Sequence, residues 1–149
     1  MYTLERSLVV PRPLDEVFPF FADAANLERL TPPFLGFTIL TPQPIAMHAG
    51  TLIDYRIRLN GIPMRWRTLI ESFEPPHRFV DTQLKGPYAH WHHTHTFREV
   101  PGGTEIADLV RYALPLGPLG RLAHAVLVRR QLTTIFDYRA KVMTEMFGS

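Results

Sequence analysis

Hydrophobic and polar residues alternate along most of the chain, and clusters of proline and glycine interrupt the alternation. A period of two predicts β-strands, because successive side chains on a strand point to opposite faces. Proline and glycine mark the turns, since proline lacks the backbone donor and glycine accepts turn conformations. We therefore predict about seven strands, at residues 2–10, 34–40, 51–59, 62–74, 78–85, 88–99 and 104–113.

Helical spacing replaces the alternation after the first strand and again at the C-terminal end, whereas residues 41–50 and 114–118 are predicted to be loops. Apolar residues recur at this spacing over residues 14–21, where Pro19 should break or kink the helix. A second short helix follows, and Asp23 is its expected N-cap. Residues 119–147 contain no proline and carry an apolar stripe, which predicts a terminal helix roughly 40 Å long. Such a helix is long enough to cross a whole small sheet, so an α+β protein is expected.

The Asn60-Gly61 dipeptide predicts a two-residue hairpin turn between the third and fourth strands. This register places Tyr55 opposite Trp66, on a face whose other residues are aliphatic apart from Thr68. The other face of the hairpin carries four arginines: Arg56, Arg58, Arg65 and Arg67. The aromatic face is therefore expected to be inside, and the arginine face is interpreted as a solvated surface that discourages aggregation.

The turn at Pro101-Gly102 fixes the register of the last hairpin. It pairs three sets of residues on one inward face: Trp91 with Tyr112, His93 with Val110, and His95 with Asp108. The inner wall is then aromatic and aliphatic with one polar cluster. Several buried polar groups favour a cavity over a closed core, because they need partners or water.

A two-residue turn at Gly86-Pro87 would set the remaining register and place Val80 opposite His93. Residues 80, 82 and 84 would then face inward, and Asp81 would face outward, opposite His92. His90 and His92 repeat the His-x-His spacing, but on the outer face they are interpreted as solvated polar residues.

His93, His95 and Asp108 are the candidate chemical groups. In one interpretation Asp108 orients His95 as a general base for proton abstraction beside a carbonyl. In a second, the two histidines and a carboxylate bind a metal ion. In the third, the cluster satisfies its own hydrogen bonds or holds a ligand oxygen, and no catalytic residue is assigned.

The aromatic side chains of the inner wall either pack as a core or line a flat-sided pocket. Arg139 falls within the apolar stripe of the terminal helix, where it could reach a ligand carboxylate or pair with a carboxylate of the protein. The residues predicted to contact a ligand are Tyr55, Trp66, Trp91, His93, His95, Asp108, Val110, Tyr112, Phe136 and Arg139.

Composition and charge exclude several classes of protein. At 149 residues and 46% hydrophobic residues, residues 1–149 are expected to form one domain. A formal net charge of +2 does not make the basic stripe that nucleic-acid binding needs. The absence of cysteine excludes disulfides and cysteine-based zinc sites. Without a signal-peptide pattern or a membrane-length apolar run, a cytoplasmic protein with no resident metal or cofactor is expected.

The chain resembles the START-like superfamily (SRPBCC), which includes polyketide cyclases, coenzyme Q-binding proteins and pollen-allergen-type lipid carriers. Its resembling segments are Val10-Pro11-Arg12-Pro13-Leu14-Asp15-Glu16-Val17-Phe18, Leu30-Thr31-Pro32-Pro33, Gly86-Pro87-Tyr88 with Trp91-His92-His93, Gly103-Thr104-Glu105-Ile106-Ala107-Asp108, and the loop from Pro115 to Gly117 before Ile135-Phe136-Asp137-Tyr138-Arg139. The resemblance implies a helix-grip fold, in which a curved sheet wraps the terminal helix around a pocket for hydrophobic ligands. The superfamily has no universal catalytic residue, so the resemblance assigns none.

Three functions follow from these observations. The leading hypothesis is binding or transport of a small apolar or amphipathic molecule, such as a lipid, a quinone or a polyketide-like ring. One alternative is a cyclase- or dehydrase-type enzyme that uses His93, His95 and Asp108 as acid and base. Another is a protein-interaction module that docks a partner on the arginine face. The sequence leaves open the ligand, the oligomeric state and any transient contact with a membrane surface.

Overall fold

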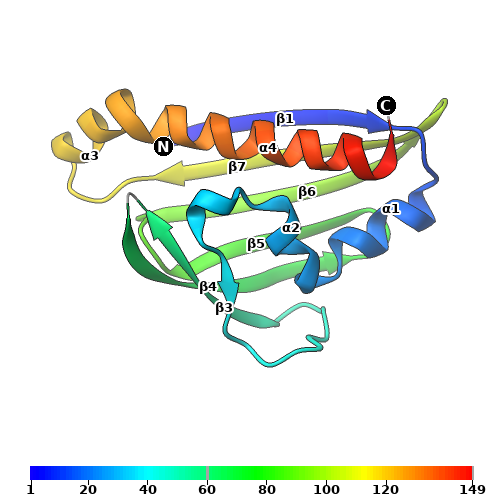
Figure 1. Ribbon diagram of the computed structural model, residues 1–149, viewed down its shortest axis with the longest axis horizontal. Helices are drawn as coiled ribbons and strands as arrows, with labels where there is room; N and C mark the ends of the chain where they lie inside the picture. The colour runs from blue at the N-terminus through cyan, green and yellow to red at the C-terminus, as the bar shows by residue number, and fades with distance from the viewer. Residues whose placement is uncertain (60, 149) are drawn as a thin grey trace.

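Seven antiparallel strands form one sheet that curves around the terminal helix (Figure 1). The computed structural model describes residues 1–59 and 61–148, and its strand order is β1-β7-β6-β5-β4-β3-β2. The strands are β1 (Tyr2–Val10), β2 (Thr38–Ile39), β3 (Leu52–Leu59), β4 (Ile62–Glu74), β5 (Arg78–Lys85), β6 (His90–Val100) and β7 (Gly103–Ala113). The predicted α+β helix-grip class is confirmed.

Short helices follow β1 and lie on the same side of the sheet as the terminal helix (Figure 1). They are α1 (Leu14–Phe21), the 3₁₀ turn η1 (Ala24–Asn26), α2 (Leu27–Leu30) and the 3₁₀ turn η2 (Pro33–Leu35). Helix α1 continues through Pro19 and is not broken there. Asp23 accepts a hydrogen bond from the Ala25 backbone N–H in its expected capping role. Because η2 occupies the start of the predicted strand 34–40, only β2 remains of it.

The terminal helix runs from Pro118 to Phe147 in three segments. These are α3 (Pro118–Ala123), the π-helical segment η3 (His124–Val128) and α4 (Arg129–Phe147). Within the described ranges, no helix is both long and apolar enough to cross a membrane.

The core lies on the inner face of the sheet, in clusters along the terminal helix. Toward the C-terminus, Phe18 of α1 packs edge-on against Phe97 of β6, with ring centroids 5.1 Å apart. Toward the N-terminal end of the same terminal helix, Leu132 and Phe136 pack with the aromatic side chains of β4 and β6. This burial supplies the main favourable free energy of the fold.

Both hairpin registers predicted from clear turn signals are present. Tyr55 pairs with Trp66, and His95 pairs with Asp108. The Asn60-Gly61 turn falls partly on Asn60, which lies outside the described residues, but the register that it predicted holds throughout β3 and β4.

The register between β5 and β6 differs from the prediction by one residue. Asp81, rather than Val80, lies opposite His93. The connecting loop is wider than a two-residue turn, because the Gln83 side chain accepts a hydrogen bond from the Tyr88 N–H at 3.1 Å and donates one to its carbonyl at 2.8 Å. A shift of one residue exchanges the faces of a strand. Asp81 therefore faces inward, and the prediction that put it outside is wrong.

Candidate functional site

A cavity of about 180 Å³ lies between the inner face of the sheet and the helices. Most of its walls are apolar, and they include Leu27, Ile53, Ile57, Trp66, Trp91 and Phe136. The two indoles meet edge to face, with ring centroids 5.3 Å apart. An engineered apolar cavity of about 150 Å³ holds benzene, so this one has room for one or two small rings.

The cavity gathers most of the residues predicted to contact a ligand. Those in its walls are Tyr55, Trp66, Trp91, His93, His95, Phe136 and Arg139. Asp108 and Val110 are buried but lie outside the lining. Tyr112 points elsewhere, because its hydroxyl hydrogen-bonds His124 Nε2 at 2.8 Å.

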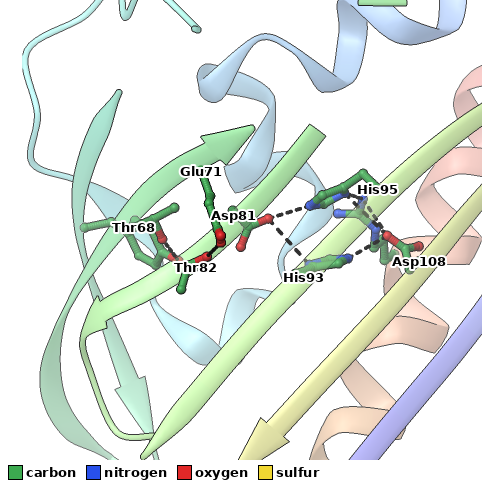
Figure 2. Close-up of polar contacts among 9 residues, drawn as sticks. Thr68, Glu71, Asp81, Thr82, His93, His95 and Asp108 are labelled. Atoms are coloured by element: carbon green, nitrogen blue, oxygen red, sulfur yellow. Dashed lines mark hydrogen bonds and ion pairs between the residues drawn. The ribbon is translucent and has the colours of Figure 1, made fainter. Parts of the chain in front are cut away.

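One wall of the cavity is polar. Figure 2 shows the imidazoles of His93 and His95 between the carboxylates of Asp81 and Asp108. His95 Nε2 donates to Asp81 Oδ2 at 2.5 Å, and His93 Nε2 donates to Asp108 Oδ1 at 2.8 Å. The two rings stack with their centroids 3.7 Å apart. The expectation that Asp108 orients His95 is therefore revised, because Asp108 bonds His93 and Asp81 holds His95.

Arg139 of α4 closes this network from the helix side. Its Nη2 lies 3.4 Å from Asp108 Oδ1 and 3.4 Å from His95 Nδ1, and the side chain is buried. A buried guanidinium needs a compensating carboxylate, and Asp108 supplies it. The arginine predicted to reach either a ligand or a protein carboxylate thus pairs with the protein while still lining the cavity.

Electrostatics keep the carboxylates charged. Burial opposes ionisation of Asp108, but Arg139 and the hydrogen bond from His93 outweigh it and hold the pKa of Asp108 below its usual value. At Asp81, burial likewise opposes ionisation, and the two histidines outweigh it and lower its pKa. Burial, followed by the nearby His93, lowers the pKa of His95 to about 4. His95 is accordingly a neutral imidazole at neutral pH.

Two buried donors in the cavity wall have no hydrogen-bond partner within the described part of the chain. They are the indole Nε1 of Trp66 and the guanidinium Nε of Arg139. An unpaired buried donor costs about 1–3 kcal/mol. A bound molecule with acceptor oxygens would relieve that cost.

Asp81 and Tyr88 are among the residues of the site that sequence reasoning missed. Asp81 was assigned to the outer face, and Tyr88 was treated as the start of a strand. Tyr88 instead lines the cavity and packs on Trp91, with ring centroids 4.8 Å apart. The residue that could have indicated the correct register is Gln83, whose side-chain amide bonds both the N–H and the carbonyl of Tyr88. Nothing in the local sequence distinguishes it from an ordinary strand residue.

Comparison with known proteins agrees with this architecture. The model of a family described as polyketide cyclase / dehydrase and lipid transport matches residues 10–136. A comparison with curated protein sequences finds no match.

Several solved structures share the fold at low sequence identity. A START superfamily protein from Mycobacterium smegmatis superposes with a TM-score of 0.71 at 10% identity, covering 99% of this chain and 97% of that chain. The Zhui aromatase/cyclase from Streptomyces sp. R1128 gives a TM-score of 0.68 at 14% identity, covering 97% and 95%. A protein from Chromobacterium violaceum gives 0.73 at 14% identity, covering 100% and 99%.

Proposed function

The chain belongs to the polyketide cyclase/dehydrase and lipid transport family, and on that basis we propose that its cavity binds one small amphipathic molecule. The observation that carries this proposal is an apolar cavity with one buried polar wall, formed by Asp81, His93, His95 and Arg139. The sheet and helices that enclose it extend from Tyr2 to Phe147, which supports one ligand-binding domain over residues 1–149.

The size and chemistry of the cavity narrow the class of ligand. About 180 Å³ suits one or two fused rings, whereas an extended acyl chain would require the walls to move. The unpartnered donors of Trp66 and Arg139 favour a ligand that carries a carbonyl or similar acceptor oxygen.

A matched pair of probes tests the proposal. The molecules 1-indanone and indane share a two-ring skeleton and differ by one carbonyl group. Both tryptophans of the chain line the cavity, so binding is followed by intrinsic fluorescence. We expect saturable binding of both, with 1-indanone tighter by about 2- to 10-fold, the value of one net hydrogen bond. Trp66→Phe should reduce that preference.

Variants of the arginine face distinguish ligand binding in the cavity from docking of a partner protein. Arg56→Gln and Arg65→Gln alter the exposed arginine face and should leave the affinity for 1-indanone unchanged. Failure of both probes to bind saturably would contradict the proposal. Equal affinity for the two probes would contradict only the carbonyl preference.

A second candidate function is proton abstraction beside a ligand carbonyl. It is favoured by the hydrogen-bonded pair of Asp81 and His95, which borders the cavity and places a carboxylate and an imidazole beside the proposed ligand. Its test is exchange of deuterium from solvent into the α-carbon of 1-indanone, followed by NMR. Wild-type protein should accelerate the exchange, and His95→Asn should abolish it. An exchange rate that His95→Asn leaves unchanged would contradict catalysis by this pair.

A further inference from the structure

The register between β5 and β6 places the Asp81 carboxylate on the same wall as His93 and His95. One carboxylate oxygen of Asp81 and one ring nitrogen from each histidine all lie within 4.8 Å of one another. We propose that these three residues bind a divalent transition-metal ion of the zinc class. Metal binding at this site does not depend on the proposed organic ligand, because the three side chains supply the metal ligands themselves.

Asp81 Oδ2 is the common point of this ligand set. It lies 2.5 Å from His95 Nε2 and 3.7 Å from His93 Nδ1 (Figure 2). Zinc bonds of about 2.0–2.1 Å at tetrahedral angles separate neighbouring ligand atoms by roughly 3.3 Å. Both separations therefore need to change by less than about 1 Å. Rotation of the side chains supplies such a change without moving strands β5 or β6.

Asp108 stands behind the two imidazoles, on the side away from Asp81 (Figure 2). Its Oδ1 is 2.8 Å from His93 Nε2 and 3.5 Å from His95 Nδ1. Metal-bound histidines usually donate the second ring N–H to a carboxylate, which leaves the other nitrogen free for the metal. His93 already has this arrangement. Asp108 also borders the Nδ1 of His95, so one carboxylate faces the second nitrogen of both rings.

The charge of the buried network favours a cation. Asp81 and Asp108 supply two carboxylates to the network and Arg139 supplies one guanidinium, so the carboxylates outnumber the guanidinium by one. The Arg139 Nη2 lies on the Asp108 side, 3.4 Å from that carboxylate, where its charge is already paired. Among the described residues, Asp81 is the carboxylate of the network that makes no ion pair with Arg139, which favours it as the ligand of a divalent ion.

The site opens on the cavity. Asp81, His93 and His95 line it, whereas Asp108 does not. Three protein ligands leave the fourth position of a tetrahedral ion directed at the cavity, which is the pattern of catalytic rather than structural zinc sites. The sequence suggested Asp108 as the carboxylate ligand, but the corrected register gives that position to Asp81.

The test uses the metal alone. Protein freed of metal by dialysis against a chelator is titrated with Zn²⁺ by calorimetry, and with Co²⁺ by visible absorption. We expect one Zn²⁺ per chain and the intense visible bands of four-coordinate Co²⁺. Asp81→Asn should weaken Zn²⁺ binding by more than the roughly 10- to 100-fold typical of losing an outer-shell group.

His92→Asn is the matched control, because His90 and His92 repeat the same spacing on the same strand but outside the cavity. It should leave the affinity unchanged. No Zn²⁺ binding, a weak six-coordinate Co²⁺ spectrum, or an equal loss in His92→Asn would overturn the site. Circular dichroism checks that Asp81→Asn folds, and if it does not, the Co²⁺ spectrum of the wild-type protein decides. No organic ligand is present, so this result is independent of the proposed binding function.

Discussion

Asp81 accepts a hydrogen bond from His95 Nε2 at 2.5 Å, although the residue directly across from Asp81 on β6 is His93. Asp108 repeats the pattern from β7, because it bonds His93 rather than its direct partner His95. Diagonal neighbours on a sheet lie within reach of long side chains. The crossed hydrogen bonds tie three adjacent strands into one buried network.

Asp108→Asn should destabilise the fold strongly. The substitution preserves shape but removes the carboxylate that balances the buried Arg139 guanidinium, whose Nη2 lies 3.4 Å away. Breaking a buried ion pair from one side costs about 3–5 kcal/mol. We expect the free energy of unfolding, measured by urea denaturation at neutral pH, to fall by an amount in this range.

Asp54→Asn is the control for this prediction. Asp54 pairs with Arg67 at 2.8 Å, but the two side chains are 40% and 42% exposed. An exposed pair contributes at most about 1 kcal/mol. Equal losses in the free energy of unfolding of the two variants would show that burial does not strengthen the contribution of the Asp108–Arg139 pair to stability.

Much of the fold and most of the polar cluster could be predicted from turn chemistry. An Asn-Gly or Pro-Gly turn sets the loop length by backbone preference, so the hairpins that present His93, His95 and Asp108 to the interior followed directly. At Gly86-Pro87 the loop length depends on a side chain, Gln83, that no local rule singles out. One residue of error moved Asp81 to the wrong face.

Gln83→Ala tests this explanation of the register. Both hydrogen bonds to the Tyr88 backbone are lost, and the variant leaves a donor and an acceptor without their partner. We expect the free energy of unfolding to fall by about 1–3 kcal/mol. Tryptophan fluorescence should also change, because Tyr88 packs on Trp66 and Trp91. Lys85→Ala, an exposed change on the same strand, should stay within about 0.5 kcal/mol; matching it would contradict the role of Gln83.

The terminal helix shows another limit of sequence patterns. Its apolar stripe predicts a face, but the face is buried only where the sheet lies opposite. Leu132 of α4 is buried, whereas Leu122 of α3 is 61% exposed near the end of the sheet (Figure 1). Leu132→Ala should therefore cost about 2–5 kcal/mol, and Leu122→Ala should stay within about 0.5 kcal/mol. Thermal denaturation of both variants measures the contrast, and similar shifts would contradict it.

Phe136→Ala should enlarge the cavity and change the size of ligand that it accepts. Phe136 lines the cavity and packs 5.7 Å from His93, measured between ring centroids, so its removal opens space beside the polar wall. The truncation should lower the free energy of unfolding by about 3–5 kcal/mol. We expect the variant to bind 9-fluorenone, a three-ring ketone, more tightly than the wild-type protein does, and to gain thermal stability from it.

Phe147→Ala is the matched control for this change of ligand size. Phe147 is buried at the far end of the same helix and lies outside the cavity lining. Its truncation should lower stability similarly without improving the affinity for 9-fluorenone. Binding is measured by fluorescence titration of the three proteins under conditions where each is folded. A gain in both variants, or in neither, would mean that the ring of Phe136 does not set the size limit of the cavity.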